Sequence, residues 1–495
     1  MSTIPIGQNA NGTQVELRFD KSNRHGLITG ATGTGKTVSL QLLMEGFSRA
    51  GVPVFAADVK GDLSGIAAFG SLLGKAADRG RKMTGDFIAD RFPVTFWDLF
   101  GEHGHPIKTS LQGIGPELTS QMLRLNETQA GAIAIAFKKA VDEQAWMLTL
   151  DDLRWTLNEM IEERADTCER YGNVTASSIN TAQRQLIALE SQGGDKLFGE
   201  PPFSVLDLIR LDETGRGFIN LLHADQLMEA PKLYATFLLW LLTELFRHLP
   251  EVGDIDKPKL VFFFDEAHLL FSDAPKQLLE RIERLVRLVR SKGVGVYFVT
   301  QSPKDVPDVV LSQLGNRIQH ALRAYTPKDQ RMVKAAAQAF RPNKGVDVKS
   351  IITEMGVGEA LVSCMDDAGI PLPVERVQIF PPSAHIGPIS VDERRSIIET
   401  SCFAHSRAET SVHVQGHQYM RRMKIAAGID VGLDVGPSDY TPGDLADKHA
   451  VSYAQLSALN GLDDAVPVAN RLTAKHFLYG WIVCSVLIIA TRYVV

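Results

Sequence analysis

Residues 25–37 read HGLITGATGTGKT, and this stretch decides the fold of the chain. The run His25–Thr29 is typical of a buried strand, and the next eight residues match the pattern GxxxxGK[ST] in full. The glycines let backbone N–H groups turn inward around phosphate oxygens. Apolar residues at helical spacing over Val38–Ala50 predict a helix after the loop. The stretch therefore predicts a strand, a phosphate-binding loop and a helix, a context that disfavours a plain glycine-rich turn.

The residue types in this loop suit a nucleoside triphosphate with its metal. We expect Lys36 to reach the β- and γ-phosphates of ATP, and the hydroxyl of Thr37 to ligate Mg²⁺. The residues predicted to bind the cofactor are Gly30, Ala31, Thr32, Gly33, Thr34, Gly35, Lys36 and Thr37.

Strands and helices alternate on both sides of the loop. An apolar strand over Val52–Ala57 follows the first helix, and strand, helix, strand in this order predicts a parallel sheet. The fold class is therefore α/β, with a mostly parallel sheet and helices on both of its faces. Further strands are predicted at Val15–Phe19, Phe218–Leu222, Leu260–Phe264, Val294–Thr300, Ile318–Arg323, Glu359–Cys364 and Pro373–Ile379.

The pattern changes along the chain and suggests four parts. Residues 1–102 and 211–384 would form the two halves of the sheet domain, and residues 103–210 a mostly helical insertion between them. Within the insertion, Thr149–Asp152 fits a capping box that opens a helix through Arg164. Residues 385–495 form a weakly patterned tail with an apolar end.

Two carboxylates follow the most apolar of the predicted strands. Asp265 and Glu266 come directly after Leu260–Phe264, and ligands bind at the carboxyl edge of such sheets. We expect Asp265 to hold Mg²⁺ and Glu266 to polarise the attacking water. The alternative for Glu266 is a carboxylate that only favours the start of a helix.

Polar residues at two other strand ends are candidates for the same site. Gln301 follows the strand Val294–Thr300 and could sense the γ-phosphate or orient water, or simply be a polar strand end. Asp58 and Lys60 follow the second core strand and could contact metal-bound water or phosphate. The alternative for these two residues is a capped turn.

The helix expected over Pro275–Lys292 carries four arginines at three-residue spacing. Two of them have a glutamate four residues earlier, which favours ion pairs along the helix. Arg290 has Val286 at that position, so we predict that Arg290 is an arginine finger that reaches the nucleotide of a neighbouring subunit. A solvated surface arginine is the alternative. Arg317 and Arg323 are the next candidates for this role.

Composition favours a globular protein of a reducing cytoplasm. Of the 495 residues 44% are hydrophobic, the net charge is −6, and the four cysteines include no CxxC pair. This charge argues against long basic tails, although a local basic channel is compatible with it. The N-terminus lacks the features of a signal peptide. The apolar segment Phe477–Val495 could contact a membrane, but a buried element or a divergent tail fits its short uncharged run better.

Three motifs, GATGTGKT, LVFFFDEAH and RSKGVGVYFVTQSP, together resemble the HerA/FtsK superfamily of hexameric motor ATPases. The opening PIGQNANGTQVELRFDKSNRHGLITGATGTGKT and the segment FAADVKGDLSGIA resemble the bacterial YjgR-type HerA-like proteins within it. The resemblance covers about residues 4–400. It implies a RecA-like sheet with additional strands, assembled as a homo-oligomeric ring, with DNA or another polymer threaded through it. It also implies that Gln301 senses nucleotide and that Arg290 acts in trans.

The expected function is ATP hydrolysis by a ring-forming motor that moves along double-stranded DNA. A motor or nucleotide-gated scaffold that acts on protein is the main alternative, because fold alone does not decide between them. A nucleotide-binding protein with little turnover is a third. Residues 265–268 also spell DEAH, but the chain lacks the second half that a two-domain RNA helicase needs.

Overall fold

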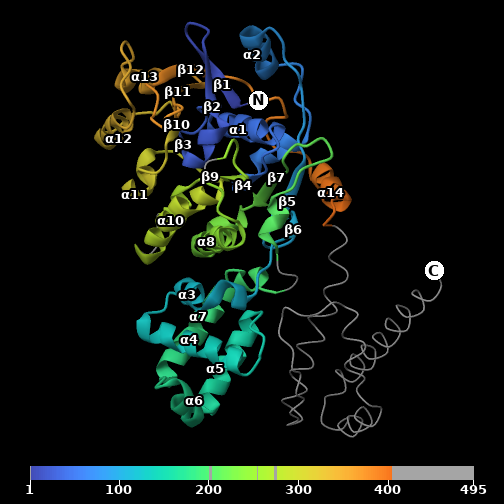
Figure 1. The fold of residues 1–495 in the computed structure, drawn as a ribbon, viewed down its shortest axis with the longest axis vertical. Helices are drawn as coiled ribbons and strands as arrows, with labels where there is room; N and C mark the ends of the chain where they lie inside the picture. Colours follow the sequence, from blue (N-terminus) through green and yellow to red (C-terminus); the bar gives the residue numbers. More distant parts are fainter. Residues whose placement is uncertain (1, 200–202, 254, 272–275, 404–495) are drawn as a thin grey trace, which may run out of the picture. The chain divides into compact units, whose positions relative to one another are not determined.

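A single large sheet organises the described part of the chain, which comprises residues 2–199, 203–253, 255–271 and 276–403 of a computed structural model. The sheet has 12 strands in the order β2-β1-β12-β11-β10-β3-β9-β8-β4-β7-β5-β6 (Figure 1). The strands are β1 (Thr3–Asn9), β2 (Gln14–Arg18), β3 (Gly26–Thr29), β4 (Val54–Asp58), β5 (Val94–Asp98), β6 (His105–Pro106), β7 (Ile219–His223), β8 (Leu260–Phe264), β9 (Val294–Thr300), β10 (Asn316–His320), β11 (Glu359–Ser363) and β12 (Glu375–Ile379).

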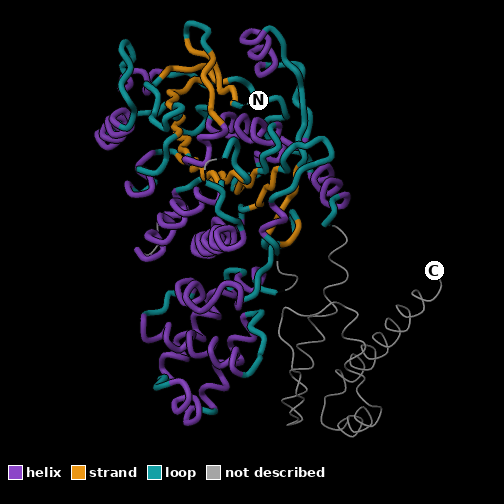
Figure 2. Tube along the Cα trace, viewed as in Figure 1, coloured by secondary structure: helices purple, strands orange, loops and turns teal. Residues whose placement is uncertain are grey.

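Fourteen α-helices are described with these strands, and Figure 2 shows both kinds of element along the chain. They are α1 (Lys36–Arg49), α2 (Lys75–Thr84), α3 (Leu111–Met122), α4 (Glu127–Asp142), α5 (Leu150–Glu162), α6 (Arg164–Tyr171), α7 (Ala176–Glu190), α8 (Pro231–His248), α9 (His268–Phe271), α10 (Lys276–Val289), α11 (Asp308–Leu311), α12 (Pro327–Gln338), α13 (Val348–Glu354) and α14 (Val391–Thr400).

The parallel half of the sheet confirms the predicted fold class. From β10 to β6 every neighbouring pair is parallel. Strands β3, β4, β8 and β9 are buried along their whole length, as expected for continuous apolar runs covered by helices on both faces. On one face, Phe47 of α1 lies with its ring centroid 6.2 Å from those of both Phe263 and Tyr297.

The other flank of the sheet is antiparallel, which the sequence did not predict. Strands β2, β1, β12 and β11 pair antiparallel, and β11 joins the parallel half through β10. Their direction depends on pairing between the two ends of the core, as in Gly7 with Ile379. The periodicity within each strand carries no information about such distant partners.

Helices α3 to α7 interrupt the sheet between β6 and β7, where a helical insertion was predicted. The capping box of α5 is confirmed, because the Thr149 side chain accepts a hydrogen bond from the backbone of Asp152, and Asp152 returns one. The helix ends at Glu162 and a second one begins at Arg164, so the predicted end was two residues late.

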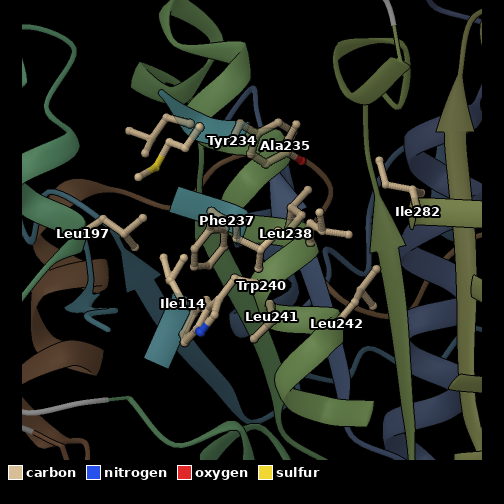
Figure 3. Packing of buried hydrophobic residues seen from close by; sticks show 14 of the residues in the cluster. Ile114, Leu197, Tyr234, Ala235, Phe237, Leu238, Trp240, Leu241, Leu242 and Ile282 are labelled. Atoms are coloured by element: carbon tan, nitrogen blue, oxygen red, sulfur yellow. The ribbon is translucent and has the colours of Figure 1, made fainter. Parts of the chain in front are cut away.

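Helix α8 joins the insertion and the sheet in one hydrophobic core. Its buried side chains include Phe237 and Trp240, whose ring centroids lie 5.7 Å apart (Figure 3). Ile114 of α3 and Leu197 belong to the same cluster. At ~25 cal/mol per Å² of apolar surface, full burial of each such side chain stabilises the fold by about 1.5–3 kcal/mol.

The C-terminal part of the chain is described only up to residue 403. Helix α14 forms at Val391–Thr400, a segment predicted to have a weak pattern. The predicted apolar end, Phe477–Val495, lies outside the described residues. None of the described helices is both long enough and apolar enough to cross a membrane.

Candidate active site

The phosphate-binding loop lies between the carboxyl end of β3 and the start of α1. Gly30, Gly33 and Gly35 have φ values of 154°, 77° and 116°, which side-chain-bearing residues rarely adopt. A Cβ added at Gly30 would lie 2.5 Å from the Cβ of His320, so glycine is also required there by packing. The Lys36 ammonium donates to the carbonyl oxygens of Gly30 at 2.7 Å and Ala31 at 3.3 Å. The lysine is thus held inside the loop.

Two neighbouring strands bring carboxylates to the same edge of the sheet. Ala57 is paired with Phe264, so Asp58 and Asp265, the residues that follow them, lie side by side. Asp265 and Glu266 are buried, as is Asp58. Strand β9 alone separates β8 from β3, which places the acidic pair about 10 Å across the sheet from the loop strand. The predicted partners of the loop therefore lie beside it.

Glu266 adopts a backbone conformation that is unusual for a residue with a side chain. Its φ is 47°, in the left-handed region. Its carboxylate forms an ion pair with Lys60, and its second oxygen lies 3.3 Å from Nδ1 of His268. Burial alone would raise the pKa of Glu266, but the hydrogen bond from Lys60 brings this pKa below its ordinary value. The carboxylate is therefore ionised, and it is oriented by Lys60, two residues beyond the end of β4.

The remaining charged groups have pKa values set mainly by burial. Burial, reinforced by Glu266, raises the pKa of Asp265 to about 6. Burial and the neighbouring Asp62 raise the pKa of Asp58 to about 7, against the hydrogen bonds donated by the backbone N–H groups of Gly61 and Leu63. Burial lowers the pKa of Lys36, although Glu266 and Asp265 oppose that shift.

These groups fit a magnesium nucleotide chemically. Carboxylate and hydroxyl oxygens are ligands that Mg²⁺ prefers, and Thr37 offers a hydroxyl in the loop while Asp265 offers a carboxylate at the same edge of the sheet. Burial, together with the neighbouring charge of Glu266, raises the pKa of Asp265, and a bound divalent cation would favour its ionised form. At Gly33 a Cβ would meet nothing within 4 Å, so the loop has open space beside its backbone.

Gln301 and Arg290 lie at opposite ends of β9. Thr29 is paired with Thr300, so Gln301 lies opposite Gly30 at the phosphate-binding edge, and its side chain is exposed. Arg290 precedes β9 and lies close enough to His25 to influence its pKa electrostatically. Seven residues of strand at ~3.3 Å each put the two positions about 20 Å apart. Arg290 therefore lies at the edge of the sheet away from its own loop.

The arginine helix differs from the prediction at its end. Helix α10 stops at Val289, and Arg290 lies in the 3₁₀ turn Arg290–Lys292 that leads into β9. The predicted helix end at Lys292 was therefore three residues late, and α-helical spacing does not apply at Arg290. Arg287 does pair with Glu283 at 3.0 Å, as its spacing predicted.

The two alternative arginines have local roles. Arg317 donates to the backbone carbonyl oxygens of Leu311, Leu314 and Ala339. Arg323 donates to the carbonyl oxygen of Thr353 at 3.2 Å.

Sequence reasoning missed the histidine beneath the loop. His320 ends β10, and its Nδ1 donates to the carbonyl oxygen of Glu359 at 3.0 Å while Nε2 lies 2.9 Å from the Ser39 hydroxyl. Burial lowers its pKa to about 4, so the ring is neutral and its Nε2 accepts from Ser39. The neighbouring Gln319 accepts from the Thr29 hydroxyl at 2.6 Å. The available signal was the pair Gln319 and His320, two polar residues within the predicted strand Ile318–Arg323.

Comparison with known proteins identifies the family. The model of the family described as "Helicase HerA-like C-terminal" matches residues 3–421. The chain belongs to this family. A "DNA double-strand break repair helicase HerA" of Sulfolobus acidocaldarius is 22% identical over 72% of the chain and 65% of its own length. A probable helicase of Methanocaldococcus jannaschii is 34% identical over 25% of the chain and 22% of its own length. The chain thus spans less than two thirds of these relatives.

Solved structures support the same fold. The unbound bacterial conjugative coupling protein TrwB, lacking 70 N-terminal residues, matches 79% of the HerA-like chain with a TM-score of 0.54 and 14% identity. TrwB in complex with the GTP analogue GDPNP covers 78% with a TM-score of 0.53 and 14% identity. Each comparison covers 92% of the TrwB chain.

The raised pKa of Asp58 predicts a pH-dependent stability. Because the pKa in the folded state, about 7, exceeds the ordinary value of 3.8, this group stabilises the fold at low pH. That contribution is lost as pH rises through 7. Asp58→Asn should remove this loss, so the nucleotide-free variant should gain stability relative to the parent between pH 5 and pH 8 in urea unfolding. Asp392→Asn, at an exposed carboxyl, is the control and should follow the parent. Parallel curves for Asp58→Asn would contradict the assignment.

Proposed function

We propose that this HerA-like chain hydrolyses ATP with Mg²⁺ at the edge of the sheet formed by β3, β8 and β4. One observation carries the proposal: the loop Gly30–Thr37 and the buried pair Asp265 and Glu266 lie at the same carboxyl edge. A loop alone would only bind phosphate. An ionised carboxylate held beside it by Lys60 adds a group that can act on water.

Each residue of the site would have a role in ATP hydrolysis that follows from its position. The backbone of Gly30–Thr37 holds the phosphates, and Lys36 turns from the carbonyl oxygens that it now contacts to the β- and γ-phosphates. Glu266 aligns the attacking water and accepts its proton, and Gln301 senses the γ-phosphate. Bound Mg²⁺ would be held by Thr37 and Asp265, and it would neutralise charge on the phosphate oxygens.

The position of Arg290 supports a site shared between subunits. Its backbone lies about 20 Å from the phosphate-binding edge along β9, which is farther than an arginine side chain reaches to its own loop. We infer that Arg290 contacts the nucleotide of the next subunit in a homo-oligomeric ring. We propose that this ring is a hexamer. Each subunit would then present its loop at one edge and its finger at the other.

The polymer that we propose for this ring is double-stranded DNA. The support is the family, whose relative in Sulfolobus acidocaldarius is named a DNA double-strand break repair helicase. The net charge of −6 requires that any contact with DNA be made by a local basic surface. The alternative is a motor that acts on protein, and the effect of DNA on the rate of ATP hydrolysis distinguishes the two.

Substitution of Glu266 should reduce ATP turnover without abolishing ATP binding. Glu266→Gln keeps the shape of the side chain but removes its charge, so ATP binding should persist while turnover falls by about 10²–10⁴-fold. Lys36→Ala should lose both. Steady-state ATPase rates and calorimetric binding measure the two effects, with Glu213→Gln, at an exposed site, as the control. Unchanged turnover in Glu266→Gln would leave a nucleotide-binding protein without this hydrolytic site.

A shared site predicts complementation between two inactive variants. In a mixed ring, a Lys36→Ala subunit still supplies its finger to an Arg290→Ala neighbour whose loop is intact. Each variant alone should turn over little ATP, and an equal mixture should recover about a quarter of the parent rate, since half of the loops are intact and half of these face an intact finger. Arg287→Ala should stay active. A mixture that recovers no activity would argue against action in trans.

Duplex DNA should stimulate ATP turnover. Because phosphate contacts release counterions, the stimulation should fall steeply between 50 and 200 mM salt, by roughly 10³-fold or more in affinity if six or more phosphates are contacted. The rate should be measured with duplex DNA, single strands and RNA on protein whose mass in solution is known. An equal rate with and without every nucleic acid would exclude DNA as the polymer and favour a protein substrate.

A further inference from the structure

A cavity of about 420 Å³ lies beside the phosphate-binding loop, on the antiparallel side of the sheet. One wall is formed by α2, through Arg79, Lys82 and Met83. The other is formed by residues 356–359, the turn before β11, and by Gln378 of β12. Its volume lies in the range of about 300–1,000 Å³ that is usual for small-molecule sites.

The turn that forms this wall is hydrogen-bonded to the loop itself. The backbone N–H of Gly358 donates to the carbonyl oxygen of Thr34 at 3.1 Å. The next residue, Glu359, accepts from the buried His320 beneath the loop. A Cβ added at Gly35 would lie only 3.4 Å from the backbone nitrogen of Gly358. The cavity is therefore separated from the loop by little more than one turn of backbone.

The order of the strands gives the direction in which a bound nucleotide must extend. The γ-phosphate has to face Asp265 and Glu266, which follow β8 on one side of the loop strand β3. The opposite end of the triphosphate chain then points toward β10, β11 and β12. The cavity lies on this side.

Arg79 is hydrogen-bonded to the turn at residues 356–359 and has one N–H group that is not used in these contacts. Its guanidinium donates to the carbonyl oxygens of Gly358 at 2.6 Å and Val357 at 3.4 Å. Its Nε is buried without a hydrogen-bond partner among the described residues. The planar guanidinium also presents a face on which an aromatic ring can stack.

We propose that this cavity receives the base and ribose of the nucleotide, so that α2 and the turn at residues 356–359 form the nucleoside half of the site. Met83 and Val357 would supply apolar contact, and the Gln378 amide offers both a donor and an acceptor to the edge of a purine. The proposal rests on the proposed function, because it takes the triphosphate to lie in Gly30–Thr37.

Inorganic tripolyphosphate separates the two halves of the site, because it has the phosphates of ATP without the nucleoside. The parent protein should bind ATP at least about tenfold more tightly than tripolyphosphate in calorimetry with Mg²⁺, a difference of about 1.4 kcal/mol. Met83→Trp, which fills the cavity, and Gln378→Ala should reduce that ratio at least about threefold by weakening ATP alone. Val309→Trp, on the exposed surface of α11, is the matched control and should change neither ligand.

Other results would contradict either the cavity as the nucleoside site or the proposed function. Equal affinity of the parent protein for the two ligands, or an ATP affinity that both cavity variants leave unchanged, would show that the nucleoside lies elsewhere. Failure of the parent protein to bind either ligand would instead contradict the proposed function. If Met83→Trp does not fold, Gln378→Ala and photolabelling of the parent with 8-azido-ATP decide the question. Labelling should fall in residues 75–84 or 356–359, and labelling only in other segments would refute the cavity as the nucleoside site.

Discussion

The rest of the site depends on the burial of three carboxylates at one edge of a parallel sheet. Asp58, Asp265 and Glu266 end or follow adjacent apolar strands, so the fold forces them together away from water. Such a cluster is unfavourable unless opposite charge lies nearby. Lys60 supplies one cation to Glu266, and Lys36 approaches from the loop. Burial, reinforced by the neighbouring carboxylates, raises the pKa values of Asp58 and Asp265, and a divalent cation would stabilise their ionised forms.

Local sequence predicted the parts of this site that lie within one motif. The loop, the apolar strand before Asp265 and the capping box at Thr149 each place all of their determining residues within a few positions. His320 and the cavity beside α2 involve residues that meet only through strand register, so no single stretch of sequence contains their signal. The same reason explains the unpredicted antiparallel flank. The end of α10 at Val289 was missed because the arginine spacing continues past the last helical residue.

Glu266 shows a conflict between backbone and side chain. A left-handed conformation disfavours a residue with a Cβ by about 1–2 kcal/mol, and glycine or asparagine would adopt it more readily. The contacts of its carboxylate with Lys60 and His268 offset part of that energy. A residue that is retained against its backbone preference is better explained by the direction of its carboxylate than by the stability of the turn.

The place of β3 in the sheet has a consequence for how the protein is made. Its two neighbours, β9 and β10, follow it by about 270 and 290 residues, so the strand that leads into the phosphate-binding loop has no partner in the sheet until more than half of the chain has been synthesised. At roughly 5–20 residues per second, that interval lasts on the order of 15–60 s. Helices α3 to α7 need only local contacts and can form during this time. During this interval the apolar strand β3 has no partner in the sheet, and unpaired apolar strands are prone to aggregate.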